Sequence, residues 1–266
     1  FEYDIKDFLY FKIDRKKKIL ASTLLLALGF TKTEIVDEFY EKELYSYDVK
    51  TEKWKTKFNP ENYKTKNFSE EVIDAKTGKV VIKLGEKINY LSAKKLSSDG
   101  LKDILVSTES LYGKFLHRDI KISDDEEGTF KIGTELNDTI IQQILDTKIH
   151  TLEVSITNSI NKGAYLLTTI LNDKNNNKDE AITEVYKMLR PGEPPTIEIA
   201  TQIFNNLFFS SDRYDLSDVG RVKMNSRLDL ECSDKITILR NEDIIAIIHK
   251  MLDLRDGKDD VDDIDH

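Results

Sequence analysis

The chain has 266 residues, of which 39% are hydrophobic, and its formal net charge at pH 7 is −9. This length and apolar fraction suffice for one large domain or two ordinary ones. The negative net charge argues against a general polyanion binder, because phosphate contacts need locally positive surface. The single cysteine, Cys232, excludes an internal disulfide, so we expect a cytoplasmic protein. The longest apolar stretch, Ile19 to Leu28, is too short to span a bilayer, so we expect no membrane segment.

Residues 1 to 40 predict a strand followed by two helices. Leu9, Phe11 and Ile13 alternate with Phe8, Tyr10 and Lys12, a period-two pattern rich in aromatic residues that is typical of a strand. A short apolar helix follows and ends at Gly29, and the pattern Thr31-x-x-Glu34 is a capping box that opens the second helix.

Four consecutive cations, Arg15, Lys16, Lys17 and Lys18, lie between the predicted strand and the first helix. Adjacent positive charges concentrate potential on one edge of a molecule, so the run could bind phosphates. It could equally form a solvated turn, and the residues alone leave both interpretations open.

Residues 41 to 150 differ in character, with lysine-rich extended segments, glycine turns and one helix expected near Asp138 to Asp146. A shift of 48 residues aligns a weak internal repeat, pairing Lys83 with Lys131, Gly85 with Gly133, Ile88 with Leu136, Leu96 with Ile144 and Ile104 with Leu152. We interpret it as a duplicated strand-turn-strand-helix-strand unit in a separate small module, with a chance match as the alternative. The acids Asp124 to Glu127 are expected in a hairpin loop.

From about residue 155 the chain predicts helices, after a polar loop at Asn172 to Lys178. Three prolines fall within Arg190 to Thr196 and end a helix over Ala181 to Leu189, because each fixes φ and removes a backbone donor. Thr196 is expected to cap the next helix, whose apolar stripe would be Ile199, Ile203 and Leu207. The stretch predicts a rigid corner between two helices.

A final helix is expected to begin with Asn241 as its cap and to end at Gly257. Upstream of it, Arg213, Arg221, Lys223 and Arg227 lie among aspartates, which favours structural ion pairs. The acidic tail from Asp259 to Asp265 lacks the ligand alternation and glycine of an EF-hand loop, so a solvated terminus is favoured over weak cation binding.

Motifs for catalysis are absent from the sequence. The four histidines form no HxxxH or HExxH pair, and the phosphate loop, dinucleotide fingerprint and nucleophile elbow have no counterpart. We therefore expect no metal, no cofactor and no catalytic residue in this chain. Composition and spacing predict a soluble, mixed, non-catalytic binding module.

Five strings occur in order along the chain, namely FKIDRKKK at Phe11 to Lys18, RPGEPPT at Arg190 to Thr196, LFF at Leu207 to Phe209, DRYDLS at Asp212 to Ser217, and VDDIDH at Val261 to His266. Together they resemble the lobe region of the bacterial RNA polymerase β subunit. The resemblance frames both ends and covers about residues 1 to 40 and 155 to 266.

This resemblance implies an α+β fold in which a mixed lobe of helices and a small sheet is interrupted by an inserted, β-rich α+β module. The lobe would comprise residues 1–40 and 151–266, and the insertion residues 41–150. Polymerases of this kind often carry a lineage-specific insertion at this place, so the module is a candidate docking surface for transcription regulators.

The resemblance also implies a positional role within DNA-directed RNA polymerase, a nucleotidyltransferase whose catalytic aspartates lie in another subunit. The lobe would form one wall of the downstream DNA channel and help to hold the non-template strand. Ile264 and Asp265 match residues that form a pocket for an unstacked guanine, and Arg15, Lys16, Lys17 and Lys18 would contact the DNA backbone without reading sequence. The implied partners are DNA, the β′, α and ω subunits, and σ factor.

The chain departs from the family pattern at several positions. Leu20 and Leu26 stand where proline and arginine are usual, and Asp259 and Asp260 where glycine and glutamate are usual, which implies a different turn before the guanine pocket. The alternative function is a free-standing protein-interaction module with the insertion as its working part. The gene sequence beyond both ends of this chain distinguishes the two functions. A polymerase lobe requires one long reading frame that continues in both directions, whereas nearby stop codons would favour the free-standing module.

Overall fold

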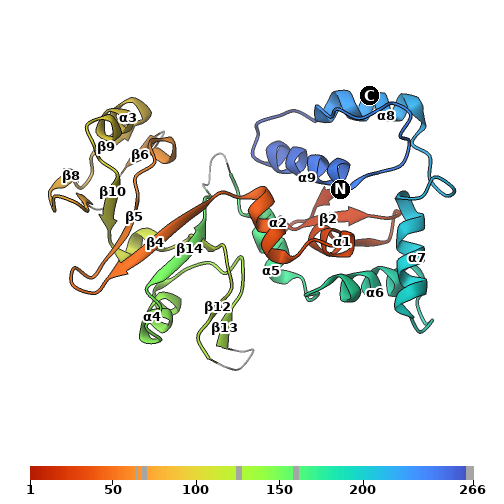
Figure 1. Cartoon of the computed structure of the whole chain (residues 1–266), viewed down its shortest axis with the longest axis horizontal. Coiled ribbons are helices and arrows are strands. Elements are labelled where there is room, and N and C mark those ends of the chain that lie inside the picture. Colours follow the sequence, from red (N-terminus) through yellow and green to blue (C-terminus); the bar gives the residue numbers. More distant parts are fainter. Residues whose placement is uncertain (64, 68–70, 124–127, 158–161, 262–266) are drawn as a thin grey trace. The chain divides into compact units, whose positions relative to one another are not determined.

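The computed structural model describes residues 1–63, 65–67, 71–123, 128–157 and 162–261. The chain divides into two compact units (Figure 1). Unit 1 consists of Phe1–Phe39 and Thr157–His266, and unit 2 of Tyr40–Ile156. Both helices and strands occur in each unit, so the predicted α+β fold class is confirmed.

Unit 1 combines a small antiparallel sheet with helices. The sheet has the order β1-β2-β3, formed by β1 (Glu2–Tyr3), β2 (Leu9–Lys12) and β3 (Lys18–Leu20). Its helices are α1 (Ala21–Leu28), α2 (Lys32–Phe39), α5 (Tyr165–Asn172), α6 (Lys178–Leu189), α7 (Ile197–Phe208), α8 (Ser217–Leu228) and α9 (Asn241–Arg255). The sequence predicted one N-terminal strand, whereas the structure forms three, because the short flanking strands gain their hydrogen bonds only by pairing with β2.

The local signals predicted at the start of unit 1 are confirmed. Leu9 and Phe11 on β2 are buried, as the period of two requires. Gly29 ends α1 with φ 107°, a left-handed conformation that glycine adopts without steric cost. Both hydrogen bonds of the capping box form at α2, from Thr31 N to Glu34 Oε2 (2.8 Å) and from Glu34 N to Thr31 Oγ1 (3.2 Å).

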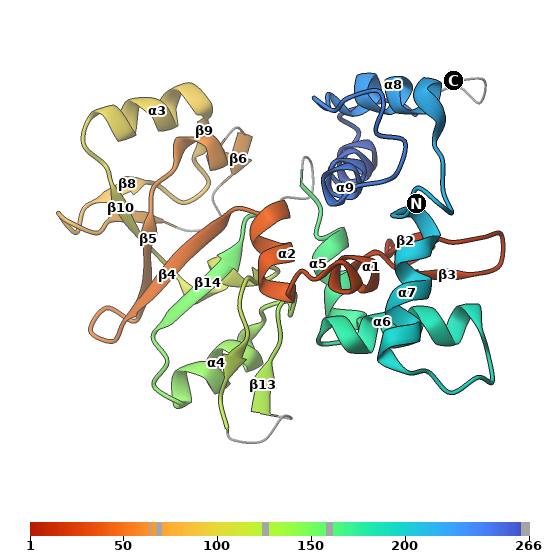
Figure 2. The ribbon, with the colours of Figure 1, turned by 45° about the vertical axis from the view of Figure 1, so that its right-hand side comes forward.

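The proline corner between α6 and α7 forms as predicted (Figure 2). Thr196 caps α7 by accepting from Ile199 N at 3.5 Å. The predicted apolar stripe of α7 is wrong, however. Ile199 is 49% exposed, and the helix buries Ala200 and Phe204 instead. The Phe204 ring packs against Phe209 at 5.6 Å between centroids, and burying this large ring sets the rotation of the helix.

Unit 2 is built on a seven-stranded antiparallel sheet of order β11-β14-β4-β5-β10-β7-β8, with two small two-stranded sheets, β12-β13 and β6-β9. Its strands are β4 (Lys42–Asp48), β5 (Lys53–Lys57), β6 (Thr65–Asn67), β7 (Val72–Asp74), β8 (Val80–Ile82), β9 (Lys87–Asn89), β10 (Asp103–Val106), β11 (Phe115–Leu116), β12 (Ile120–Lys121), β13 (Thr129–Phe130) and β14 (Thr151–Ser155). Its helices are α3 (Tyr90–Ser98) and α4 (Asp138–Asp146), with single 3-10 turns η1 (Pro60–Tyr63) and η2 (Thr108–Leu111).

The internal repeat of 48 residues is confirmed by the elements of unit 2. Helices α3 and α4 begin and end 48 residues apart, and so do the strand pairs Val72–Ile82 and Ile120–Phe130. Asn89 caps α3 by accepting from Ser92 N, and Asn137 caps α4 by accepting from Ile140 N. Residues 72–106 (copy 1) and 120–154 (copy 2) are therefore two copies of one hairpin-helix-strand unit. Asp124 to Glu127, predicted in a hairpin loop, lie outside the described residues.

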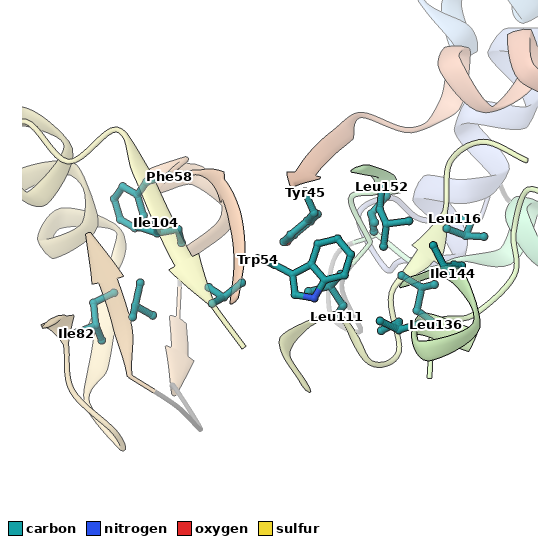
Figure 3. Close-up of a cluster of buried hydrophobic side chains, with 14 of the residues drawn as sticks. Tyr45, Trp54, Phe58, Ile82, Ile104, Leu111, Leu116, Leu136, Ile144 and Leu152 are labelled. Carbon is teal, nitrogen blue, oxygen red and sulfur yellow. The ribbon is translucent and has the colours of Figure 1, made fainter. Parts of the chain in front are cut away.

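One apolar core joins the two copies. The last strands of the copies, β10 and β14, pair with β5 and β4, which pair with each other at the centre of the sheet. Fully buried Trp54 on β5 lies among side chains from both copies (Figure 3). Matching positions contribute to this core, namely Val72, Ile88, Ala93, Ile104 and Val106 from copy 1, and Ile120, Leu136, Ile141, Leu152 and Val154 from copy 2.

Candidate nucleic-acid interface

The four predicted cations lie in and beside the turn of the β2–β3 hairpin. Asp14 orders this turn, since its Oδ1 accepts from Lys16 N at 2.8 Å and Lys17 N at 2.9 Å. These backbone donors, first that of Lys16, lower the pKa of the Asp14 carboxyl. An ionised aspartate therefore fixes the backbone from which the cations project.

Two of the four cations are bound within unit 1. Lys17 Nζ donates to the carbonyl oxygen of Leu189 at 3.4 Å, at the C-terminal end of α6, where unpaired carbonyls attract positive charge. Lys18 Nζ lies 3.6 Å from Glu2 Oε1 and 4.2 Å from the centroid of the Tyr10 ring. These contacts hold the hairpin in place and leave Lys17 and Lys18 less available to a ligand.

Arg15 and Lys16 are the exposed pair at the tip of the turn. Within the described part of the chain, neither side chain has a hydrogen-bond or ion-pair partner. A guanidinium and an ammonium on adjacent residues can each meet a phosphate oxygen while remaining hydrated in the unbound state. The structure thus separates the predicted run of four into two anchoring cations and two that are open to a ligand.

The end of α6 adds cations that the sequence analysis did not select. Because Lys17 reaches Leu189, the hairpin turn lies beside this helix end, which also carries exposed Lys187 and Arg190. Arg190 Nη1 is 3.5 Å from Glu193 Oε2, so part of its charge is already balanced. Enrichment of cations in the last turn of a helix was the signal that could have indicated them.

Ile264 and Asp265, the predicted guanine contacts, lie outside the described residues. The segment that leads to them is tied to both α8 and α9. Asp259 Oδ2 is 2.6 Å from Lys250 Nζ and 3.0 Å from Arg227 Nη1, and Arg227 Nη2 donates to the Asp260 carbonyl at 2.8 Å. The hydrogen bond from Lys250, followed by that from Arg227, holds the pKa of the Asp259 carboxyl well below its usual range. Asp259 is therefore a carboxylate anchored to both helices.

A buried ion pair joins α8 to the start of α9. Arg221 and Asp243 are both fully buried and form two parallel hydrogen bonds, Nη1 to Oδ1 at 2.9 Å and Nη2 to Oδ2 at 2.8 Å. Arg221 Nε also donates to the Ile236 carbonyl at 2.6 Å. Burial opposes ionisation of Asp243, but the hydrogen bonds from Arg221 and Arg240 outweigh it and lower the pKa of this carboxyl.

The structural ion pairs predicted for this arginine cluster are confirmed for Arg221 and Arg227, whose partners lie farther along the chain than the neighbouring aspartates. The cap predicted for α9 is wrong by one residue. Arg240 is the N-cap, and its backbone N–H donates to Asp243 Oδ2 at 2.9 Å. Asp243 is thus held in place both by a helix cap and by an ion pair.

Other kinds of site find no support among the described residues. Their His, Cys, Asp and Glu side chains form no group of three or more placed to hold a metal ion. None of the helices in this part of the chain has the length and hydropathy to cross a membrane.

The chain is similar to known proteins along its whole length. The family model of RNA polymerase Rpb2, domain 2, matches residues 142–266. The DNA-directed RNA polymerase subunit beta of Rickettsia prowazekii is 42% identical over 266 residues, and that of Rhizobium leguminosarum bv. trifolii is 43% identical over 265 residues. Each match covers 100% of this chain, unit 2 included, and 19% of the relative. The chain spans about a fifth of the length of the curated relatives it matches.

Proposed function

Because the chain belongs to the family of bacterial DNA-directed RNA polymerase β subunits, we propose that unit 1 is the lobe of such a subunit. In this proposal the lobe is non-catalytic, lines the downstream DNA channel and contacts the non-template strand. Nucleotidyl transfer belongs to the complete polymerase, in which DNA, the β′, α and ω subunits and σ factor are the partners.

The β2–β3 hairpin carries the DNA-binding part of the proposal. The chain as a whole is acidic, with a net charge of −9, yet Arg15 and Lys16 form an exposed positive tip on an ordered turn. Contacts of this kind to phosphates position a nucleic acid without reading its sequence. Arg15 and Lys16 are the proposed backbone contacts, while Lys17 and Lys18 support the hairpin.

The test removes the two exposed charges in the intact polymerase. Arg15→Gln together with Lys16→Gln should reduce the slope of log affinity against log salt concentration by about 2 for double-stranded DNA, since each phosphate contact contributes about 0.9. Lys223→Gln with Lys235→Gln is the matched control, because both lysines are exposed in unit 1 and lie on α8 and in the segment before α9, not on the hairpin. An unchanged salt slope in the hairpin variant, measured by filter binding of downstream DNA, would contradict the proposed contact.

We further propose that Ile264 and Asp265 receive an unstacked guanine of the non-template strand. The support is the VDDIDH string together with the anchoring of Asp259 and Asp260, which ties the start of this string to α8 and α9. A carboxylate can accept two hydrogen bonds from the Watson–Crick edge of guanine, and an isoleucine can pack on the base face. In the intact polymerase, Asp265→Ala should reduce the preference for guanine at one non-template position, whereas Asp262→Ala should leave it unchanged. Equal binding of all four bases by the unmutated enzyme would refute this assignment.

Unit 2 is proposed to be the insertion, with docking of transcription regulators as its role. It has its own apolar core, and its two ends are adjacent, since Ile156 N donates to the Glu41 carbonyl at 2.8 Å. Adjacent ends are typical of domains inserted into another domain. A polymerase in which a short glycine-serine linker replaces residues 40–156 should keep basal transcription and lose its response to the regulators that dock there. Loss of basal transcription, in an assembled enzyme, would contradict this division.

A further inference from the structure

The helices α3 and α4 occupy equivalent positions in the two copies, but their exposed faces have different chemistry. On the inner side, Ala93 and Ile141 are both fully buried. On the outer side, the positions that correspond at a shift of 48 residues are all exposed. They are Leu91, Lys94 and Lys95 on α3, and Thr139, Gln142 and Gln143 on α4. One copy therefore presents a leucine between cations where the other presents neutral polar side chains.

The difference extends over the whole of the two copies. Copy 1 contains seven lysines and four acids, whereas copy 2 contains three lysines and eight acids. The turn before β9 also exposes an apolar side chain in copy 1, where Leu84 is 67% exposed. Its counterpart in copy 2, Ile132, is only 3% exposed. Copy 1 thus presents more basic side chains than copy 2, together with the exposed Leu84 and Leu91.

The outer face of α3 has the arrangement of a docking surface. Spacings of three and four residues place Leu91, Lys94 and Lys95 on one side of the helix. Leu91 is 74% exposed, and within the described residues neither lysine has a carboxylate partner. Lys94 Nζ lies 5.9 Å from the centroid of the Tyr90 ring, which leaves its remaining donors open. Burial of an exposed leucine against a partner is favourable, because it removes apolar surface from water. Lysines without a carboxylate partner favour a partner that carries acidic side chains.

We propose that the α3 face (Leu91, Lys94 and Lys95), together with Leu84 on the preceding turn, docks an acidic amphipathic segment of a partner protein. Charge complementarity argues for acidic side chains, and the two leucines argue for apolar anchors between them. A nucleic acid fits less well, because its phosphates would meet the lysines but leave the leucines uncovered. The inference rests on the docking role proposed for unit 2 and supplies the chemistry of the partner.

The two copies provide a matched set of substitutions. Leu91→Thr, Lys94→Gln and Lys95→Gln each place on α3 the residue that α4 carries at the corresponding exposed position. The probe is a fluorescent synthetic peptide with leucines at helical spacing and glutamates between them, titrated with the full 266-residue chain. The triple variant should bind this peptide about tenfold more weakly, given the usual contributions of surface charges and one apolar contact. Binding to the unmutated chain should weaken with added salt.

Controls separate the partner classes. Lys50→Gln with Lys131→Gln removes two exposed lysines elsewhere in unit 2 and should leave peptide affinity unchanged. The same peptide with serines for leucines should lose most of its affinity. If the triple variant is destabilised in urea, Lys94→Gln with Lys95→Gln replaces it. No binding of the leucine peptide, or equal binding of the triple variant, overturns the proposal, as does preferential binding of a DNA oligonucleotide to this face. None of these outcomes bears on the hairpin contacts of unit 1, whose test uses different residues and a different ligand.

Discussion

The two units bury their side chains in different ways. Unit 2 has an apolar core that draws on the same positions of two copies, with Trp54 among them. Unit 1 also buries acidic side chains, namely Asp243, which pairs with Arg221, and Asp173, which accepts from Ser22 Oγ at 2.5 Å and from Thr23 Oγ1 at 2.8 Å. Among the described residues of unit 2, the buried polar side chains are Thr56, His117 and Ser155. Apolar contacts are non-directional, so a duplicated unit can keep its fold while its surface changes. Buried polar pairs are directional, so parts of unit 1 depend on single partners.

The largest expected effect comes from breaking the buried pair of unit 1. Arg221→Met should lower the stability of the α8–α9 region by about 3–5 kcal/mol, because Asp243 would remain buried without its main partner. Hydrogen exchange of the amides in α8 and α9 measures this loss. Lys223→Met makes the same chemical change on the exposed side of α8 and should cost little. If both substitutions have the same effect, the pair does not hold this region.

The second prediction tests whether the copies of unit 2 are energetically equivalent. Ile104→Ala and Leu152→Ala occupy matching core positions, are 1% and 0% exposed, and should each lower the free energy of unfolding by about 2–5 kcal/mol. Trp54 is the single tryptophan of the chain, so urea unfolding followed by tryptophan fluorescence reports on unit 2. Losses that agree within about 1 kcal/mol would support equivalence, whereas a near-zero loss at one site would disprove it.

The pH dependence of unit 1 is the third prediction. The pKa of the Asp243 carboxyl is lowered in the folded chain from its ordinary value of 3.8, so its contribution to stability is present above that value. This contribution is lost as the pH falls from about 4 through the lower pKa of the folded state. Between pH 5 and 2, the protection factors of α8 and α9 amides, which correct for the intrinsic exchange rate at each pH, should therefore fall more in the unmutated chain than in Asp243→Asn. Parallel pH profiles would show that another group governs acid sensitivity.

The smallest effects are expected at the helix caps of unit 2. Asn89→Ala and Asn137→Ala each remove a side-chain acceptor from a helix N-terminus and should cost about 1 kcal/mol. Asn241→Ala, at the residue that the sequence suggested as the cap of α9, should change stability by less than about 0.5 kcal/mol, since Arg240 is the N-cap. Urea unfolding compares Asn89→Ala with Asn137→Ala, and hydrogen exchange follows Asn241→Ala. A larger loss for Asn241→Ala would reverse the assignment of the cap.

Predictions from local pattern succeeded where neighbouring residues carry the signal. The capping box at Thr31, the end of α6 before the prolines and the bounds of α4 are all confirmed. The prediction failed on α7, where the sequence had to indicate which face of the helix is buried. Ile199 and Ala200 both fit an apolar stripe, and only the packing of Phe204 against Phe209 selects the face that carries Ala200. The run of cations in the sequence indicated the candidate site. It did not distinguish the two lysines that anchor the hairpin from the two exposed cations at its tip.

The sequence by itself determined the capping box of α2, the end of α6, the bounds of α4, the 48-residue repeat and the family, because these depend on local propensity, spacing and ordered strings. Tertiary structure alone decided that Lys17 and Lys18 hold the hairpin while Arg15 and Lys16 stay open. It also decided that Ser22 and Thr23, polar residues within an apolar helix, serve the buried Asp173 about 150 positions away. Such partners are distant in sequence, and a buried polar group is stable only where the fold brings its hydrogen-bonding partner to it.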